Sequence, residues 1–431
     1  MAGFINQLVK PFIGHHDWNG VFYSQIARNY LNLGLVITKL GQFTGGGYYT
    51  HYPPLFPLTL ALAFKLFGVS DLVARVVPAV FTLGYLILLV VIARKLKFSR
   101  LGSLAALAVA ASPMVRYFSL MPSQEAMIVF FSFLSLNFYL DLGKQPNRPN
   151  LIKFLIATAL NGLTGWAGYF LYPFIFLHAA IFKPRLKRAA ALSLGVLVAT
   201  FALHLIHVFW LTGSFTGGGL LEALLLRLNL TSTLDSVDPR SASFTLKGYL
   251  IQEVRWLTVY YTRILAAAGL IFLLAQLKNL KRLTALTPQA SIILVLFLFG
   301  LAYPVIFSNV VYIHEYFNIF LLPFLALSFS WLVEWLKKKS FKLALVTLLT
   351  LIFVIAWERR QFVEALYATQ AHRPGYDLGT LINQTAPEGQ LVTVYASEEF
   401  IDLNGLFVSF YAGRQIKFIP SRSEPRFEYY D

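Results

Sequence analysis

The sequence predicts an all-α protein that crosses a membrane many times and ends in a small α/β appendage. Of its 431 residues, 57% are hydrophobic and only 13% are charged, and the mean hydropathy is +0.63. Soluble domains carry about 25% charged residues, so a chain this apolar must place most of its helices in lipid. The same composition excludes a receptor with a single span.

The net charge of +16 raises the alternative of a nucleic-acid partner. The Lys and Arg residues, however, fall in short clusters between apolar runs, which is typical of cytoplasmic loops. We therefore expect membrane lipid, and no nucleic acid, as a partner. The absence of cysteine excludes disulfides, thiolate zinc sites and a thiol nucleophile, so any metal must be held by His, Asp or Glu.

We expect three regions: an outer-face region with interfacial helices (1–70), a transmembrane helical bundle (71–357) and a small extracytoplasmic α/β tail (358–431). In the first region, residues 20–34 place apolar side chains at helical spacing and Arg28 and Asn29 off that stripe. This pattern predicts an amphipathic helix on the membrane surface. The apolar run 54–67 is shorter than the ~20 residues of a span and is expected to be interfacial or re-entrant.

About ten spans are expected in the bundle, near 71–94, 101–118, 123–141, 151–168, 170–182, 189–211, 257–276, 289–307, 317–336 and 341–357. This count brings the basic clusters between the spans to one side, which the positive-inside rule identifies as the cytoplasm. The first region, the loop 212–256 and the tail then face outside. If the run 54–67 were a true crossing, Asp17 would be cytoplasmic instead.

The tail differs in character from the rest of the chain. Residues 377–385 and 400–411 are expected to be helices, and residues 390–395 and 416–419 strands. This alternation predicts a small α/β unit. The abrupt end at Asp431 leaves open whether the unit is complete.

The polar stretch 15–19 holds the candidate reaction centre, Asp17. A carboxylate, with an ordinary pKa of ~3.9, takes the proton of an acceptor hydroxyl only as the new bond forms in the transition state. Asp is also a favoured helix N-cap, and the spacing alone makes catalysis and capping equal alternatives. Adjacent loop histidines such as His15 and His16 are either metal ligands or solvated side chains.

Four further segments carry candidate substrate-binding residues. His51 and Tyr52 precede a Pro-Pro pair that is primarily a turn device, so the prediction there depends on His51. Glu125 begins a span, where it is either a helix-dipole partner or a functional acid. His314 and Glu315 open another span, as substrate-binding residues or as a surface ion pair.

Arg263 is expected about two turns inside its span, where it either snorkels outward or anchors a lipid phosphate. Because each candidate lies at or near the outer end of its segment, we expect five of them to converge on one outward-facing pocket: Asp17, His51, Glu125, Arg263 and His314. Whether a divalent metal ion is needed stays open, with His16 and His51 as its candidate ligands.

A family resemblance rests on residues 26–29 and Gly34, then on the run from His51 through the Pro-Pro pair to 68, and continues through Arg75 and 122–125. These motifs resemble the C-type membrane glycosyltransferases, and within them the protein O-mannosyltransferase and aminoarabinose-transferase-like group. The likeness covers about the first third of the chain. It implies a polyprenyl-phosphate sugar donor, an outward active site and an acidic catalyst in the first loop, which corresponds to Asp17.

Three features depart from this group. Relatives usually have a second acid directly after the catalytic one, where this chain has Trp18. Many have a lysine beside the Pro-Pro pair, where His51 and Tyr52 stand. They also begin with a membrane helix ahead of the first loop, which predicts that the natural start lies further upstream.

The predicted function is therefore the transfer of a hexosyl or pentosyl group from a polyprenyl-phosphate donor to a hydroxyl of a glycan, lipid or protein. The reaction needs a base for that hydroxyl and cations or a metal for the leaving phosphate, and a single displacement inverts the anomeric centre. The alternatives are a polysaccharide polymerase or ligase using a lipid diphosphate, a transporter or flippase, and a lipid-binding scaffold. Transporters place ionisable sites at the membrane midplane, whereas here these residues gather at one face.

Overall fold

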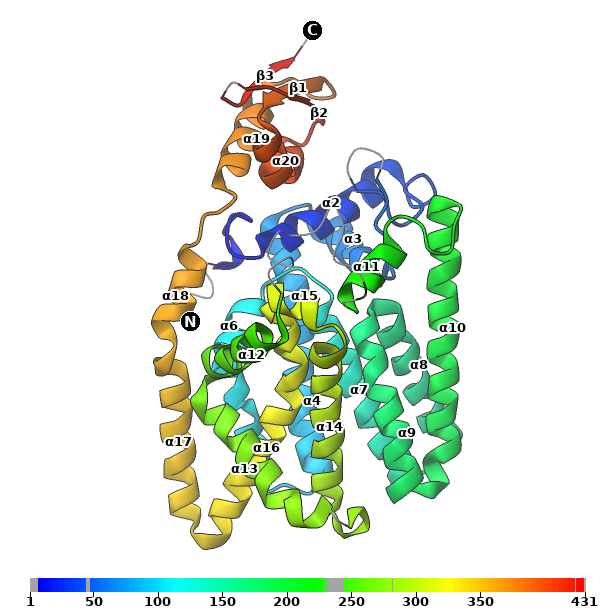
Figure 1. The fold of residues 1–431 in the computed structure, drawn as a ribbon, viewed down its shortest axis with the longest axis vertical. Helices are drawn as coiled ribbons and strands as arrows, with labels where there is room; N and C mark the ends of the chain where they lie inside the picture. The colour runs from blue at the N-terminus through cyan, green and yellow to red at the C-terminus, as the bar shows by residue number, and fades with distance from the viewer. Residues whose placement is uncertain are drawn as a thin grey trace.

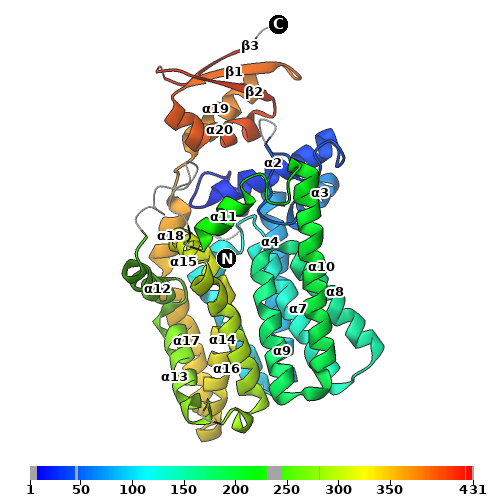
Figure 2. The same ribbon diagram turned by 45° about the vertical axis from the view of Figure 1, so that its right-hand side comes forward.

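Long helices stand side by side in one bundle, and shorter helices and a small α/β unit cover one end of it (Figures 1 and 2). The computed structural model describes residues 7–43, 47–228, 230, 244–280, 282–422 and 424–429.

Within these residues, six helical segments are long and apolar enough to cross a membrane, and one bent pair of helices would make a seventh span. The multi-pass, largely helical fold with a C-terminal α/β unit is therefore confirmed. The six segments are α4 (Asp71–Lys95), α7 (Glu125–Lys144), η3 with α10 (Pro184–Leu186, Lys187–Thr212), α14 (Pro288–Ile306), η6 with α16 (Glu315–Leu321, Leu322–Lys339) and α17 with α18 (Phe341–Glu358, Arg360–Ala368).

The other expected spans are shorter or broken. The range 101–118 holds α5 (Arg100–Ala105), the 3-10 helix η1 (Ala106–Ala111) and α6 (Pro113–Phe118). Because proline lacks a backbone donor and suits the first turn of a helix, a new helix begins at Pro113. The ranges 151–168 and 170–182 hold α8 (Arg148–Thr164) and α9 (Leu171–Phe182), which are joined at Gly165 and η2 (Trp166–Phe170).

The expected span 257–276 does not begin where the hydropathy suggests. Its first residues belong to α12 (Leu246–Tyr260). The chain bends by 113° between α12 and the next helix, α13 (Thr262–Leu280). Thr262 has a positive φ of 69°, a conformation that few non-glycine residues adopt. The chain therefore turns sharply at this point, and Arg263 is the second residue of α13.

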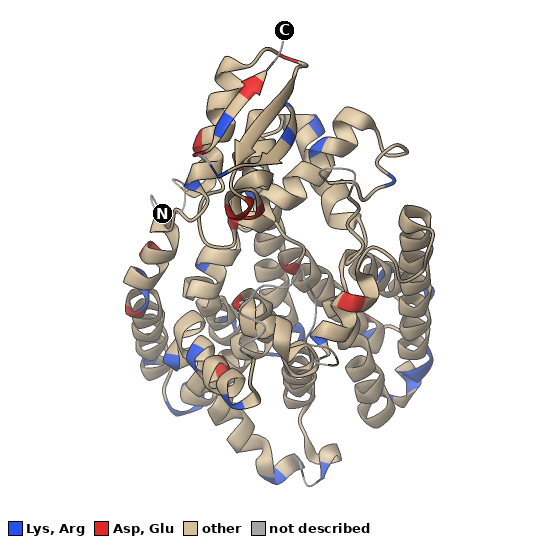
Figure 3. Ribbon diagram, turned by 45° about the horizontal axis from the view of Figure 1, so that its top comes forward, with Lys and Arg blue, Asp and Glu red and all other residues tan. Residues whose placement is uncertain are grey.

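The two ends of the bundle differ in charge. The turns that join α9 to α10, α13 to α14 and α16 to α17 lie at the end away from α2 (Figure 1). Lys183 lies in the first of these turns, Lys278 and Lys337 lie in the last turns of α13 and α16, and Figure 3 shows basic residues along that end. Asp17 and the α/β unit lie at the other end, so the basic clusters and the candidate site are separated by the length of the bundle.

The described part of the region before α4 includes the helices α2 (Asp17–Leu33) and α3 (Leu55–Phe67). The helix expected over 20–34 is present, but its polar side is not free, contrary to our expectation for a surface helix. Arg28 donates to the carbonyls of Ser409 and Phe410, at 3.0 and 2.6 Å, and is covered by the tail. Asn29 donates to the carbonyl of Gln42 at 3.1 Å.

The tail is the expected α/β unit: α19 (Arg373–Thr385), β1 (Leu391–Ala396), α20 (Glu398–Ala412), β2 (Gln415–Pro420) and β3 (Arg426–Tyr429). The strand order is β2-β1-β3, with β1 parallel to β2 and antiparallel to β3. The helices and first two strands agree with the prediction, while β3 was not predicted. The unit packs on α2 through α20, and therefore covers the end of the bundle that holds Asp17.

Candidate active site

Two cavities share the start of α2 as a common wall. The first, which we call the Arg227 cavity, has a volume of about 500 Å³ and is lined by Trp18 and Asn19. The second, the Asp17 cavity, has a volume of about 410 Å³ and is lined by His15 and Asp17. Since consecutive Cα atoms are 3.8 Å apart, only the helix start separates the two cavities.

The Arg227 cavity brings together four of the residues that the sequence predicted, namely His51, Tyr52, Glu125 and His314. Its remaining walls are largely aromatic. They include Trp18, Phe22, Tyr23, Phe43, Tyr48, Tyr49, Tyr316 and Phe317. A cavity with aromatic walls and a few polar groups is the usual form of a small-molecule site.

Arg227 is the main cation of this cavity, and the sequence did not single it out. It ends α11 (Leu220–Arg227), is only 9% exposed, and holds its guanidinium 5.6 Å from the ring centres of Tyr52 and Trp166. Among the described residues no carboxylate lies within ion-pair distance, and the buried Nη1 atom has no hydrogen-bond partner. A buried guanidinium without a counter-ion is costly, and a phosphate group would balance its charge.

The polar groups around Arg227 are held in neutral form. Burial, together with the nearby Arg227 charge, lowers the pKa of His51 to about 3. Burial also raises the pKa of Tyr23 and of Tyr49 well above the usual range, and their hydroxyls lie 3.1 Å apart. His51 and the two tyrosines therefore offer uncharged hydrogen-bonding groups next to the fixed positive charge of Arg227.

Glu125 supplies the carboxylate of the Arg227 cavity. It is the first residue of α7 and is buried, and its Oε1 accepts a hydrogen bond of 3.1 Å from the side chain of Gln124. Negative charge is favoured at a helix N-terminus, which is one of the two roles that the sequence left open. The position also puts an acid in the same cavity as Arg227.

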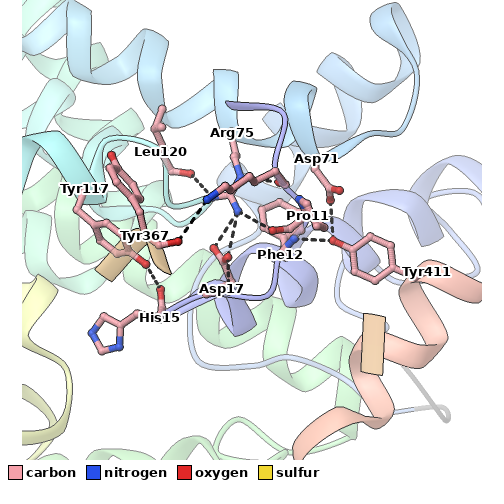
Figure 4. A network of polar contacts seen from close by, with 12 residues as sticks. Pro11, Phe12, His15, Asp17, Asp71, Arg75, Tyr117, Leu120, Tyr367 and Tyr411 are labelled. Atoms are coloured by element: carbon pink, nitrogen blue, oxygen red, sulfur yellow. Dashed lines mark hydrogen bonds and ion pairs between the residues drawn. The ribbon is translucent and has the colours of Figure 1, made fainter. Parts of the chain in front are cut away.

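Asp17 is held by a tightly arranged ion pair (Figure 4). Arg75 Nη2 lies 3.1 Å from both carboxylate oxygens, and the backbone N–H of Gly14 donates to Oδ2 at 2.8 Å. Arg75 is itself fixed by the carbonyls of Pro11 and Leu120, at 3.3 and 3.4 Å. The N-cap of α2 is His16, and its side chain makes no capping hydrogen bond, so the alternative that Asp17 caps this helix is wrong.

Glu315 lies next to the wall between the cavities, and it is not a surface residue. His15 Nε2 lies 2.5 Å from its Oε1, and His16 Nε2 lies 3.1 Å from its Oε2. The hydroxyl of Tyr260 also donates to Oε1, at 2.7 Å. The surface ion pair that the sequence allowed is therefore wrong, because the carboxylate is buried among three side chains.

The expected convergence on a single pocket is wrong for two residues. Arg263 is 79% exposed in its side chain, and its Nε lies 3.9 Å from Glu358 Oε1. The bend before α13 places it at the beginning of that helix, so it is not two turns inside a span. Asp17 faces the neighbouring cavity, because its carboxylate is directed at Arg75.

A sequence model of the dolichyl-phosphate-mannose-protein mannosyltransferase family matches residues 51–211. The predicted resemblance to this group of membrane glycosyltransferases is confirmed. The matched segment includes His51, Arg75 and Glu125, whereas Asp17, Arg227 and Glu315 lie outside it. The helices and this family match identify the chain as an integral, multi-pass membrane protein.

No curated protein matches the chain. Among solved structures, it is similar to crystal structures of ArnT from Cupriavidus metallidurans in the apo state and bound to undecaprenyl phosphate. Each is 15% identical to this chain, and the alignments cover 98% of this chain and 84% and 85% of the other. The TM-scores are 0.47 and 0.46.

Proposed function

We propose that the chain is a membrane glycosyltransferase that moves a hexosyl or pentosyl group from a polyprenyl-phosphate donor to a hydroxyl acceptor at the outer face of the membrane. The observation that carries this proposal is the buried guanidinium of Arg227 in a cavity of about 500 Å³ with aromatic walls. The match of residues 51–211 to a family of mannosyltransferases supports the reaction class.

Arg227 is proposed to hold the donor phosphate. A guanidinium binds phosphate oxygens through two parallel hydrogen bonds, and both gain strength where water is excluded. Its planar group already lies against the rings of Tyr52 and Trp166, so little side-chain freedom is lost on binding. As the bond to the sugar breaks, the phosphate gains negative charge, and the fixed cation stabilises that charge in the transition state.

The sugar would lie against the aromatic wall formed by Trp18 and Phe22. These two rings are stacked, with centres 4.7 Å apart, and present flat apolar surface at the start of α2. Neutral His51 and the tyrosine hydroxyls supply hydrogen bonds without competing for the phosphate charge. This combination suits a ligand that has one anionic group and several hydroxyls.

Asp17 is proposed as the base for the acceptor hydroxyl. Its carboxylate is oriented by Arg75 and Gly14, and the Asp17 cavity offers the acceptor a separate approach. A donor in one cavity and an acceptor in the other would meet at the start of α2. The transfer then breaks the bond between the anomeric carbon and the phosphate oxygen, forms one to the acceptor oxygen, and inverts the anomeric centre. Glu125 is the competing candidate, because it lines the cavity that contains Arg227.

The outer-face location rests on charge. Basic clusters occupy the end of the bundle away from Asp17, and such clusters are retained in the cytoplasm. Cysteine labelling at Asn19 and Ser340, in a chain that has no natural cysteine, tests the location. Labelling of both positions from the same side of the membrane would contradict it.

The activity is tested with the purified full chain and a panel of polyprenyl-phosphate and polyprenyl-diphosphate sugars, with release of the lipid carrier as the readout. We expect release of lipid phosphate from one or more monophosphate donors. Release only from diphosphate donors would favour a polymerase or ligase. No release from any donor, by protein that is folded, would leave the transporter and scaffold alternatives.

A matched pair of arginine variants makes this test specific. Arg227→Gln is expected to lower kcat/KM by roughly 100-fold, because a preorganised donor to the transition-state charge is removed. Arg263→Gln changes an arginine that is largely exposed and should leave the rate within about two-fold. Equal losses in the two variants would contradict the phosphate role of Arg227.

A further inference from the structure

We propose that His15, His16 and Glu315 form a binding site for a divalent transition-metal ion, with zinc as the expected occupant. The two imidazole nitrogens and a carboxylate oxygen lie within 4.8 Å of one another. Two histidines and one carboxylate are a ligand set of catalytic zinc sites, which keep a further position open for water or substrate. The sequence suggested His16 and His51 as ligands, but His51 belongs to the Arg227 cavity and not to this cluster.

The backbone at His16 is arranged to bring both imidazoles to one carboxylate. His16 has φ 57° and ψ 12°, in the left-handed region that non-glycine residues seldom adopt. Backbone strain of this kind is concentrated at functional sites. Here it places the rings of His15 and His16 with their centres 4.1 Å apart, although a single histidine would be enough to pair with Glu315.

The carboxylate has the support that metal ligands usually receive from neighbouring groups. The Tyr260 hydroxyl donates a hydrogen bond of 2.7 Å to Glu315 Oε1. Outer contacts of this kind orient the ligand and leave its other lone pairs directed at the ion. The ring of His16 is confined by Tyr316, which meets it edge-on with the ring centres 4.9 Å apart.

The cluster is accessible from several sides. The His15 side chain is 29% exposed and lines the Asp17 cavity. Glu315 lines a third cavity of about 450 Å³, together with Arg255 and Arg359. Its neighbours His314 and Tyr316 line the Arg227 cavity. An ion bound here would therefore have a route from solvent through the two cavities that His15 and Glu315 line, and would lie beside residues that line the Arg227 cavity.

Binding requires only a small movement. Two ligands at the usual zinc distance of ~2.0–2.1 Å in a tetrahedral site are roughly 3.4 Å apart. His15 Nε2 and Glu315 Oε1 are 2.5 Å apart, so this pair must open by roughly 1 Å. His15 lies on the exposed side of the cluster and can turn toward the Asp17 cavity, whereas His16 and Glu315 are more deeply buried.

The catalytic use of this ion rests on the proposed function, whereas its binding does not. A divalent cation bonded to Glu315 would add positive charge between the Asp17 and Arg227 cavities. That position suits neutralisation of the charge that develops on a leaving phosphate. The chain's own residues would supply the ion's ligands, and Asp17 would keep its role as the base.

Binding is tested on the full chain after treatment with a chelator, by titration with Co²⁺ and then Zn²⁺. We expect one Co²⁺ per chain, with the visible absorption of a four-coordinate site, and its displacement by Zn²⁺. The two ligand variants are His16→Asn and Glu315→Gln. Asparagine tolerates the left-handed conformation, so the first variant removes the ring without adding strain, and the second keeps the shape of the side chain.

Both variants are expected to lose the Co²⁺ absorption. Tyr260→Phe should weaken binding by roughly 10- to 100-fold, as loss of an outer contact does. His207→Gln, which changes the separate histidine pair His204 and His207, is the control and should bind normally. A wild-type chain that binds no Co²⁺, or ligand variants that keep its spectrum, would overturn the proposal.

The two proposals fail separately. Donor turnover by a chain that binds no metal, even before chelation, would refute this site and leave the proposed function intact. A chain that binds Co²⁺ with the expected spectrum but releases no lipid carrier from any donor would refute the function alone.

Discussion

The two cavities that share the start of α2 differ in how their charges are balanced. In the Asp17 cavity the cation and the acid face each other, with Arg75 Nη2 3.1 Å from both oxygens of Asp17. In the Arg227 cavity, within the part of the chain that is described, the guanidinium contacts aromatic rings and no carboxylate. The two charges of the Asp17 cavity are therefore paired directly, whereas Arg227 shares its cavity with Glu125 but makes no ion-pair contact with a described carboxylate.

This difference indicates that the Arg75–Asp17 pair stabilises the fold, whereas Arg227 is available to bind an anionic ligand. Removing one member of a buried ion pair leaves the other charge unbalanced, which destabilises the protein by about 3–5 kcal/mol. Removing a buried charge that has no partner does not leave a second one behind. We therefore expect variants in the Asp17 cavity to change stability, and variants at Arg227 to change activity with little loss of stability.

The largest effect on activity is expected for Asp17→Asn, which also tests whether this residue does more than balance Arg75. The amide keeps the shape of the side chain but not its basicity, so turnover should fall by roughly 10²–10⁴-fold while the donor still binds. Single-turnover rates measure the loss of turnover, and a separate binding assay measures whether the donor still binds. Near-normal turnover would assign Asp17 a purely structural role, and a comparable loss in Glu125→Gln alone would transfer the base to Glu125.

The next effect concerns stability. Arg75→Gln leaves the buried carboxylate of Asp17 without its cation and is expected to destabilise the protein by about 3–5 kcal/mol. In the double variant with Asp17→Asn most of that loss should be recovered, because neither charge remains. Thermal unfolding of the four proteins in detergent gives the coupling between the two sites. Additive losses would mean that the ion pair contributes nothing.

A smaller effect is expected for Arg227→Gln. This variant should lose activity while its stability is unchanged or higher. The roughly 100-fold loss of kcat/KM corresponds to about 2.7 kcal/mol of transition-state stabilisation. The melting temperature should stay the same or rise, since an unbalanced buried charge is removed. A fall as large as that of Arg75→Gln would show that Arg227 has a structural counter-ion, and the contrast between the cavities would then be lost.

Local sequence patterns predicted those features that depend on neighbouring residues. The spans follow from long apolar runs, and the tail follows from the alternation of strand and helix patterns over 377–419. The sequence also predicted that His51, Tyr52, Glu125 and His314 would line one cavity. Each residue lies at the outer end of its segment, so all four are expected at the same depth in the membrane.

Features that depend on tertiary packing were not predictable. Nothing near Asp17 in the sequence indicates that its carboxylate would turn to Arg75, 58 residues away. The break at Tyr261 has no proline or glycine to mark it, so the position of Arg263 was misjudged. Arg227 is a single basic residue after a leucine-rich run, and only its burial against Tyr52 and Trp166 distinguishes it from an ordinary loop arginine.

The smallest effect is a pH dependence that the charge of Arg227 helps to create. The folded protein lowers the pKa of His51 from 6.5 to about 3, first through burial and then through repulsion by Arg227. In the unfolded chain His51 therefore becomes protonated below pH 6.5, whereas in the folded protein it stays neutral until about pH 3. The stability that His51 contributes is complete above pH 6.5 and is lost as the pH falls toward 3.

Between pH 7 and pH 5 the wild-type chain should therefore lose about 1–2 kcal/mol more stability than His51→Gln, which has no titrating ring. Unfolding in detergent at the two pH values measures the difference. In Arg227→Gln one of the two causes is gone while the burial of His51 remains, so the folded-state pKa of His51 should lie above about 3. This variant should therefore lose less stability than the wild-type chain between pH 5 and pH 3. If the two proteins lose the same stability between pH 5 and pH 3, Arg227 does not lower the pKa of His51, and the charge contrast between the two cavities is weakened.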